Sequence, residues 1–230
     1  MSSQDPDRTP PIGVDDAYAV ETPEQNKALY ENWATTYESG FIEYMGYVYH
    51  RTVANLFVAH RTDGDGDVLD VGCGTGIVGA ELRRLMVEPV DGLDLSPAML
   101  EQAADKTGPG GDPAFRRLIP ADLTETLPID DATYSGIVSA GTFTHGHVGP
   151  DAFDELVRIA APNAVFAIGI NAEHYEQLGF QAKLDDLVEA GAITAPDLID
   201  IAIYETDDGD HANDRALVAI FHRAARASTT

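Results

Sequence analysis

The stretch from Val68 to Ile77, which reads Val-Leu-Asp-Val-Gly-Cys-Gly-Thr-Gly-Ile, decides how this chain folds. Its first four residues form a short, mostly apolar run with a β-branched valine at each end, a pattern typical of a buried strand. Three glycines crowd into the next five residues, and apolar residues follow at helical spacing. Glycine permits the unusual backbone angles of a tight turn and lets a ligand approach the main chain. The helix start behind the turn offers free N–H groups, so the stretch predicts a strand, a ligand-binding turn and a helix.

The glycines fit two registers. Gly74, Gly76 and Gly79 satisfy G-x-G-x-x-G, the dinucleotide fingerprint that an NAD-dependent oxidoreductase would use. That register extends the strand into the glycines and places Asp70 inside it, where a carboxylate needs a partner and glycine weakens pairing. Ending the strand near Val71 instead brings Asp70 to its carboxyl end, pointing into the cleft.

In the second register the stretch resembles the acidic-residue-plus-three-glycine loop of class I S-adenosylmethionine-dependent methyltransferases. The residues that match this loop are Asp70, Gly72, Gly74 and Gly76. The next predicted strand ends in Gly-Leu-Asp-Leu-Ser, and its Asp94 falls where that family hydrogen-bonds the ribose hydroxyls. The two motifs in this order and spacing are far more specific than either motif alone. The resemblance covers residues 22 to 223 and implies S-adenosylmethionine as cofactor, with S-adenosylhomocysteine as product.

The pattern along the rest of the chain predicts an α/β fold. We expect a Rossmann-like, seven-stranded, mostly parallel sheet with a C-terminal antiparallel hairpin, helices on both faces and an N-terminal helical lid. Strands are expected at residues 68–71, 90–95, 115–119, 134–140, 163–170, 198–204 and 216–221. Helices are expected to begin at Thr22, after Gly40, at Ile77, after Ser96, at Pro150 and at Phe180.

One domain accounts for nearly the whole chain in this interpretation. Residues 1–20 are rich in Asp, Pro and Ser with little apolar content, which is typical of a disordered tail. Residues 21–225 are expected to form a single methyltransferase domain, in which residues 21–60 are the N-terminal helical lid segment. We expect no second domain or internal repeat.

The resemblance also implies which residues hold the cofactor. The aromatic segment 30–38 resembles the one that many small-molecule methyltransferases fold over the cofactor; an aromatic stripe packed on the core is the alternative. Met99 falls where that family often packs against the adenine, with ordinary helix core as the alternative. Asp122 resembles the family's acidic contact to the adenine amino group, which a carboxylate suits, with a loop-capping role as the alternative. The predicted cofactor residues are Tyr30, Trp33, Tyr37, Asp70, Gly72, Cys73, Gly74, Gly76, Asp94, Leu95, Met99, Ala121, Asp122, Leu123 and Ser139.

Two histidines are the candidates for catalysis. Open α/β sheets bind ligands beyond the carboxyl ends of their strands, so the loop 141–149 should border the active site. His145 and His147 lie in this loop, and imidazole titrates near neutrality, as a general base requires. A metal half-site would need a third ligand such as His174 or Asp151, so we expect no metal; local hydrogen bonding or solvent exposure is the third interpretation. Methyl transfer from a sulfonium is an in-line displacement that needs mainly alignment and exclusion of water, so a reacting side chain is optional.

Composition restricts the partners. The chain has 39 acidic and 14 basic residues and a formal net charge of −25. Phosphate binding needs a basic footprint, which argues against nucleic acid as substrate, and anionic membrane surfaces are disfavoured for the same reason. A high-salt environment, in which salt screens the repulsion between the acidic groups, is one explanation of such a surface, and simple solubility is the other.

No apolar run approaches the roughly 20 residues of a membrane span, and the single cysteine excludes an internal disulfide. A cytoplasmic protein is expected.

The sequence therefore predicts an S-adenosylmethionine-dependent methyltransferase that transfers a methyl group to a small-molecule acceptor by in-line displacement. The acceptor class depends on the aromatic N-terminal segment and on the lack of an added recognition domain, so a protein acceptor stays open. Two rival hypotheses are an NAD-dependent oxidoreductase and a non-catalytic S-adenosylmethionine-binding sensor or partner protein. The sequence defines neither the acceptor nor the oligomeric state.

Overall fold

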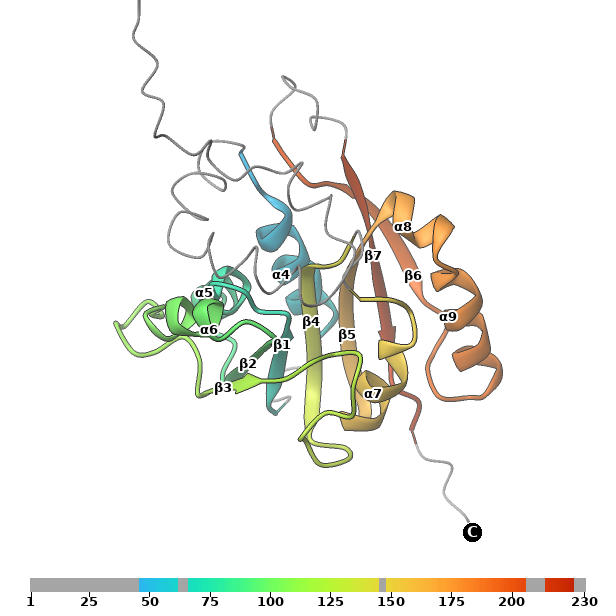
Figure 1. Cartoon of the computed structure of the whole chain (residues 1–230), viewed down its shortest axis with the longest axis horizontal. Coiled ribbons are helices and arrows are strands. Elements are labelled where there is room, and N and C mark those ends of the chain that lie inside the picture. The colour runs from blue at the N-terminus through green and yellow to red at the C-terminus, as the bar shows by residue number, and fades with distance from the viewer. Residues whose placement is uncertain (1–45, 62–65, 145–147, 206–213, 226–230) are drawn as a thin grey trace, which may run out of the picture.

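A computed structural model describes residues 46–61, 66–144, 148–205 and 214–225 of the 230-residue chain (Figure 1). The tail expected to be disordered, the helix expected at Thr22 and most of the expected lid segment lie outside the described residues. The elements, in chain order, are α4 (Tyr49–His60), β1 (Val68–Val71), α5 (Ile77–Arg84), β2 (Val90–Asp94), α6 (Pro97–Ala104), β3 (Arg117–Pro120), β4 (Tyr134–Phe143), α7 (Ala152–Ile159), β5 (Ala160–Asn171), α8 (Ala172–Gln177), α9 (Phe180–Glu189), β6 (Asp197–Ala202) and β7 (Arg215–His222). Among the described residues, no helix is both long and apolar enough to cross a membrane.

The described strands form one seven-stranded sheet in the order β3-β2-β1-β4-β5-β7-β6. The pairs from β3 to β5 are parallel, whereas β7 runs antiparallel to both β5 and β6. This arrangement confirms the predicted mostly parallel sheet with a C-terminal antiparallel hairpin. It also places β1 between β2 and β4, so that the carboxyl ends of these three strands meet at one edge.

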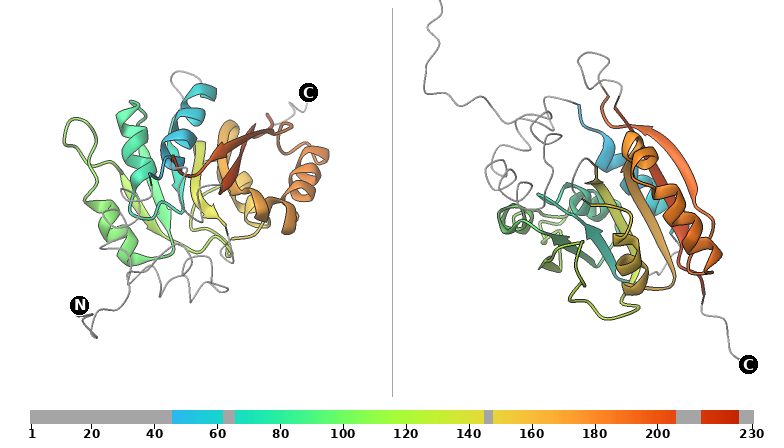
Figure 2. Two further views of the ribbon diagram at one scale, coloured as in Figure 1. Left: turned by 90° about the horizontal axis from the view of Figure 1, so that it is seen from above. Right: turned by 45° about the vertical axis from the view of Figure 1, so that its right-hand side comes forward.

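Each face of the sheet packs against helices, because side chains alternate between the faces with a period of two. Val68, Val218 and Ile220 belong to the apolar cluster under α4 and α5, whereas their neighbours Leu69, Ala219 and Phe221 belong to the cluster under α7 and α9. Figure 2 shows the helices on the two sides of the sheet, as the sequence predicted. The sheet is therefore buried on both faces, as parallel sheets require.

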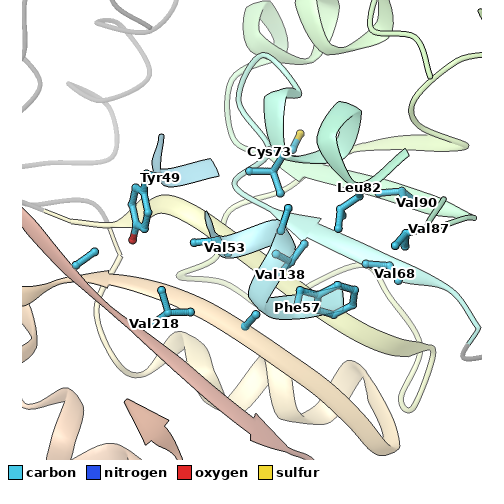
Figure 3. Packing of buried hydrophobic residues seen from close by; sticks show 14 of the residues in the cluster. Tyr49, Val53, Phe57, Val68, Cys73, Leu82, Val87, Val90, Val138 and Val218 are labelled. Atoms are coloured by element: carbon cyan, nitrogen blue, oxygen red, sulfur yellow. The ribbon is translucent and has the colours of Figure 1, made fainter. Parts of the chain in front are cut away.

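Helix α4 lies close on the sheet because two strands carry glycine beneath it. A Cβ on Gly136 of β4 would come within 2.4 Å of the Phe57 ring, and one on Gly169 of β5 within 2.2 Å of Tyr49. Figure 3 shows Tyr49, Val53 and Phe57 of α4 projecting toward the sheet. The glycine that weakens β4 as a strand is thus needed for helix packing.

Three predictions about the elements need correction. The helix expected to run on from Gly40 does not include the described residues 46–48, and α4 begins at Tyr49, because Gly46 has a left-handed φ of 61° and Tyr47 forms an isolated antiparallel bridge with Tyr204. The third strand begins at Arg117 and not at Phe115, because the Phe115 ring turns inward against the glycines of the α5 region. Helix α8 follows β5 directly and was not predicted; the Asn171 side chain caps it by accepting the N–H groups of residues 173 and 174.

Candidate active site

A pocket opens where the carboxyl ends of β1, β2 and β4 meet, as expected for an open α/β sheet. Its lining comes from the glycine turn, the end of β2, the start of α6, the segment after β3 and the tip of β4. The lining residues are Tyr47, Gly72, Cys73, Gly74, Thr75, Ile77, Val78, Leu93, Asp94, Leu95, Met99, Ala121, Asp122, Leu123, Ala140, Gly141, Thr142 and Val148.

The glycine turn has the geometry that its sequence predicts. Strand β1 ends at Val71, so the register that extends the strand into the glycines is not the one formed. Gly72, Gly74 and Gly76 have φ values of 63°, 53° and 90°, in the left-handed region that glycine adopts without strain. A Cβ on Gly72 would lie 2.0 Å from the Thr142 hydroxyl, whereas one on Gly74 would meet nothing within 4 Å. The main chain at Gly74 is therefore open to the pocket.

Asp94 lies at the end of β2 and lines the pocket. Its Oδ2 accepts the N–H of Gly74 at 2.8 Å, and its Oδ1 accepts the N–H of Ser96 at 2.8 Å. Burial raises the pKa of Asp94, and these backbone hydrogen bonds oppose the rise. Each carboxylate oxygen can accept more than one hydrogen bond, so Asp94 holds the glycine turn and still offers acceptors to a ligand hydroxyl.

Asp70 does not line the pocket, which corrects the expectation that it points into the cleft. Its side chain is fully buried beneath the glycine turn, and Oδ2 accepts the N–H of Gly79 at 3.0 Å. Its Oδ1 is buried without a hydrogen-bond partner among the described residues. Burial raises the pKa of Asp70 to about 8, the Gly79 N–H opposes the rise, and the nearby charge of Asp94 adds to it.

Met99 and Asp122 flank the pocket on the β2–β3 side. Met99 is buried, and its N–H donates to the Ser96 hydroxyl at 3.3 Å, so Ser96 caps α6 as predicted. The Asp122 Oδ1 accepts both the N–H and the hydroxyl of Thr124, at 2.8 and 2.7 Å. Asp122 therefore does cap its loop, which was the alternative interpretation. Capping uses only Oδ1, and Asp122 also lines the pocket.

The tip of β4 lines the pocket, as expected for the loop 141–149, and Tyr47 and Ala140 join it without having been predicted. The Thr142 hydroxyl donates to the carbonyl of Val71 at 3.1 Å, and Gly141 has a φ of 88° that turns the chain. Tyr47 reaches this tip from the start of α4, with its hydroxyl 3.2 Å from the place of a Cβ on Gly141. Local sequence carries no signal for this contact, because it joins segments almost 100 residues apart.

Ser139 and Gly76, both predicted to bind cofactor, do not line the pocket. Ser139 is fully buried, and its hydroxyl donates to the Val71 carbonyl at 2.7 Å. Gly76 precedes α5 and faces the Phe115 ring, which a Cβ would approach to 2.7 Å. Both residues support the turn from below, which corrects their assignment as contacts.

Thr75 and Cys73 complete the turn. The Thr75 hydroxyl is buried, lines the pocket and has no hydrogen-bond partner among the described residues. Cys73 is 4% exposed, its N–H donates to the Leu93 carbonyl at 2.9 Å, and burial raises the pKa of its thiol further above its usual range. An unpartnered hydroxyl beside an open glycine backbone fits a polar ligand, and the unionised thiol makes Cys73 a poor nucleophile.

The other predicted residues lie outside the described part of the chain. They are Tyr30, Trp33, Tyr37, His145 and His147. Within the residues that the structure describes, no group of three or more His, Cys, Asp or Glu side chains is arranged to hold a metal ion. The two assumed third ligands, His174 and Asp151, lie in α8 and at the N-cap of α7.

Comparison with known proteins identifies the class. The protein family described as "Methyltransferase domain" matches residues 68–163, the part of the chain that holds the glycine turn, Asp94 and β4. This match identifies residues 68–163 as a methyltransferase domain, and the sheet order and the pocket agree with a domain of the class whose cofactor is S-adenosylmethionine.

Individual relatives agree with this class. Human methyltransferase-like protein 27 is 35% identical over 130 residues, covering 54% of this chain and 49% of that protein. The malonyl-[acyl-carrier protein] O-methyltransferase of Geobacter sulfurreducens is 32% identical over 104 residues, covering 45% of this chain and 38% of that protein. This chain thus spans about half or less of the length of these curated relatives. The fold resembles that of the methyltransferase solved in complex with the Haloferax volcanii Trm112 methyltransferase activator, with a TM-score of 0.59, 18% identity and coverage of 85% of this chain and 97% of that one.

Proposed function

We propose that this protein transfers a methyl group from S-adenosylmethionine to a small-molecule acceptor. The observation that carries the proposal is the pairing of the open glycine turn with Asp94, whose carboxylate accepts the Gly74 N–H inside the pocket. When bound, S-adenosylmethionine supplies a sulfonium methyl group as the electrophile. The protein's task is then to orient the two reactants and to exclude water, which can lower the barrier by ~7–11 kcal/mol.

The described residues divide this task among the strand ends. Asp94 is placed to accept the ribose hydroxyls, while Met99 and Asp122 flank the place of the adenine on the β2–β3 side. Since β1 lies between β2 and β4, the reacting end of the cofactor is assigned to the β1–β4 side, next to Thr142 and Tyr47. Tyr30, Trp33 and Tyr37 are proposed to cover the cofactor from the segment that precedes Tyr47.

The acceptor is assigned to the same side of the pocket. The wall there is mostly apolar and aromatic, with Tyr47, Ala140 and Val148, which favours a small acceptor with apolar surface. The net charge of −25 disfavours an acidic macromolecule as acceptor. His145 and His147 connect Thr144 to Val148, and we propose that one of them acts as general base where the acceptor atom carries a proton.

Calorimetric titration tests the cofactor first. We expect micromolar binding of S-adenosylmethionine and S-adenosylhomocysteine and no binding of NAD. Binding of NAD alone would show that the oxidoreductase hypothesis is correct, and silence from all three would contradict the proposal.

Transfer of an isotope-labelled methyl group tests the acceptor. The protein is incubated with methyl-labelled S-adenosylmethionine and a cell extract, and the products are separated by size. We expect label in the small-molecule fraction. Label in the protein fraction would favour a protein-borne acceptor, such as the acyl-carrier-protein substrate in the name of the Geobacter relative. Cofactor binding without transfer would favour a sensor or partner protein.

A further inference from the structure

Two buried aspartates in neighbouring strands of this sheet have opposite surroundings. Asp91 of β2 is fully buried, and it accepts hydrogen bonds from the guanidinium groups of Arg116 and Arg117 and from the Tyr134 hydroxyl. Burial alone would raise the pKa of Asp91, but these donors outweigh it and hold the pKa below its usual value. Asp91 is thus a fully compensated buried anion, as a structural carboxylate should be.

Asp70 has no such compensation. It is also fully buried, but among the described residues it accepts a single hydrogen bond, from the Gly79 N–H, and its Oδ1 has no partner there. No cation pairs with it within the described chain, and Asp94, whose charge acts on it, is also an acid. Burying an ionised carboxylate with so few partners is far costlier than burying a neutral acid.

The groups around Asp70 do not change this balance. The buried or paired titratable and charged side chains on the elements packed around it are Tyr49 and His50 of α4, Cys73 of the turn, Glu81, Arg83 and Arg84 of α5, Asp91 and Asp94 of β2, and Tyr134 of β4. Arg83 is bound to Glu88, and Asp91 is bound to Arg116 and Arg117. Arg84 is already bound to Glu81. The residues that pair with Asp70 on the neighbouring strands are Gly92 of β2 and Val138 of β4, which carry no charge.

Asp70 nevertheless lies directly below the pocket. Gly72, Cys73 and Gly74, the residues that follow the end of its strand, all line the pocket. Among the described lining residues, the charged side chains are the carboxylates of Asp94 and Asp122, and none is a lysine or arginine. The described site therefore favours a cation, and the cofactor differs from its product by one positive charge on sulfur.

We propose that Asp70 distinguishes the cationic cofactor from its neutral product. Its carboxyl group is neutral in the free protein, releases its proton to solvent when the sulfonium binds, and takes a proton from solvent when the thioether product replaces the cofactor. This inference rests on the proposed function. It makes Asp70 a positioning residue that acts through charge, beneath the residues that contact the ligand.

The sign of the pH dependence follows from linkage. The sulfonium favours the ionised form of Asp70, so ionised Asp70 equally favours the sulfonium. Below the Asp70 pKa of about 8 the free protein must lose a proton to bind. Affinity for S-adenosylmethionine should then rise with pH, by up to about tenfold per pH unit. S-adenosylhomocysteine has no charge on sulfur, so its affinity should be nearly constant.

Calorimetry in buffers of different ionisation enthalpy counts the protons released on binding. At pH 7 we expect S-adenosylmethionine to release up to one proton more from the wild type than from Asp70→Asn, and S-adenosylhomocysteine to show no such difference. Asp70→Asn preserves the shape and removes the titrating group. Asp122→Asn is the matched control: it removes a pocket carboxylate, and its proton release should match that of the wild type even where its affinity is lower.

Equal proton release from wild type and Asp70→Asn would overturn the inference, as would equal extra release with both ligands. If Asp70→Asn does not fold, the wild type alone gives the answer. The ratio of the two dissociation constants is then measured between about pH 5.5 and 7, where an α-amino group stays mostly protonated. A constant ratio would overturn the inference. Failure of the proposed function is distinguishable, because the wild type would then bind neither ligand.

Discussion

Asp94 is the residue on which the pocket depends most directly. It contacts the glycine turn and the start of α6 at the same time, through one carboxylate oxygen each. A neutral replacement therefore affects both the ligand and the turn. The Asp70 carboxyl group, by contrast, lies beneath the contact surface.

Replacing Asp94 with alanine should weaken S-adenosylmethionine binding by ~1.5–3 kcal/mol, the range for hydrogen bonds to a charged group. Calorimetric titration measures this change, and circular dichroism checks the fold. Asp94→Asn is the matched control, because it keeps one carbonyl acceptor and should lose less affinity. Unchanged affinity in folded Asp94→Ala would remove this residue from the binding site.

At the scale of single residues, the sequence predicted the residues that line the pocket better than the residues that support the glycine turn from below. Asp94, Met99 and Asp122 lie in the pocket lining because short motifs place them at or within five residues of the carboxyl end of a strand. Ser139 and Asp70 lie within two residues of lining residues in the sequence, but their side chains are buried below the turn. Proximity in sequence does not show whether a side chain points into the pocket or below the turn, so both residues were wrongly assigned as cofactor contacts.

At the scale of elements, the packing of α4 on β4 gives a specific prediction. Gly136→Ala places a Cβ 2.4 Å from the Phe57 ring, which is fully buried, and overpacking of this kind costs ~1–3 kcal/mol of unfolding free energy. Urea denaturation measures the loss. Gly149→Ala is the control, since its Cβ would meet nothing within 4 Å.

A smaller side chain at position 57 tests whether the clash with the Phe57 ring causes the loss of stability in Gly136→Ala. If the clash with Phe57 is responsible, the double variant Gly136→Ala/Phe57→Leu should lose less stability than the sum of the two single variants. Strict additivity would instead indicate that the alanine disturbs β4 itself.

The predicted ends of helices and strands were wrong where tertiary contacts, and not the local apolar pattern, determine them. The apolar spacing from Phe41 to Phe57 suggested one long helix, but the left-handed Gly46 and the bridge from Tyr47 to Tyr204 delay its start. Helix α8 has only six residues, too few to show helical periodicity. By contrast, the glycine turn marks the end of β1, and Ser96 marks the end of β2 and the start of α6. These three boundaries were predicted within a residue or two.

For the whole molecule, the charge balance governs stability. Arg158, Lys183 and Arg215 pair with carboxylates, but with 39 acidic and 14 basic residues the acidic groups outnumber the basic ones by 25. Their mutual repulsion is screened over a distance that falls from ~10 Å at 0.1 M salt to ~3 Å at 1 M.

The thermal unfolding midpoint should therefore rise as KCl increases from about 0.1 to 1 M and level off above it. Differential scanning calorimetry measures the midpoint. A parallel series in sucrose, which acts by surface exclusion without screening charge, is the control. A midpoint that is independent of KCl would contradict the argument.

The global topology was predictable because two motifs resemble one family, and that family carries the observed sheet order. The acceptor was not predictable, because Tyr47, Ala140 and Val148 reach the pocket from segments without a common motif. Strand order is encoded in repeated apolar runs, whereas the shape of a binding wall depends on side chains brought together only by folding.

The single cysteine has a practical consequence. Cys73 lines the pocket but is only 4% exposed, and the chain contains no other cysteine. A thiol-modifying reagent can reach it only when the turn opens, so the modification rate in the native protein measures how often that opening occurs. The protein thus carries its own single-site kinetic reporter of active-site opening, with no need for an introduced label.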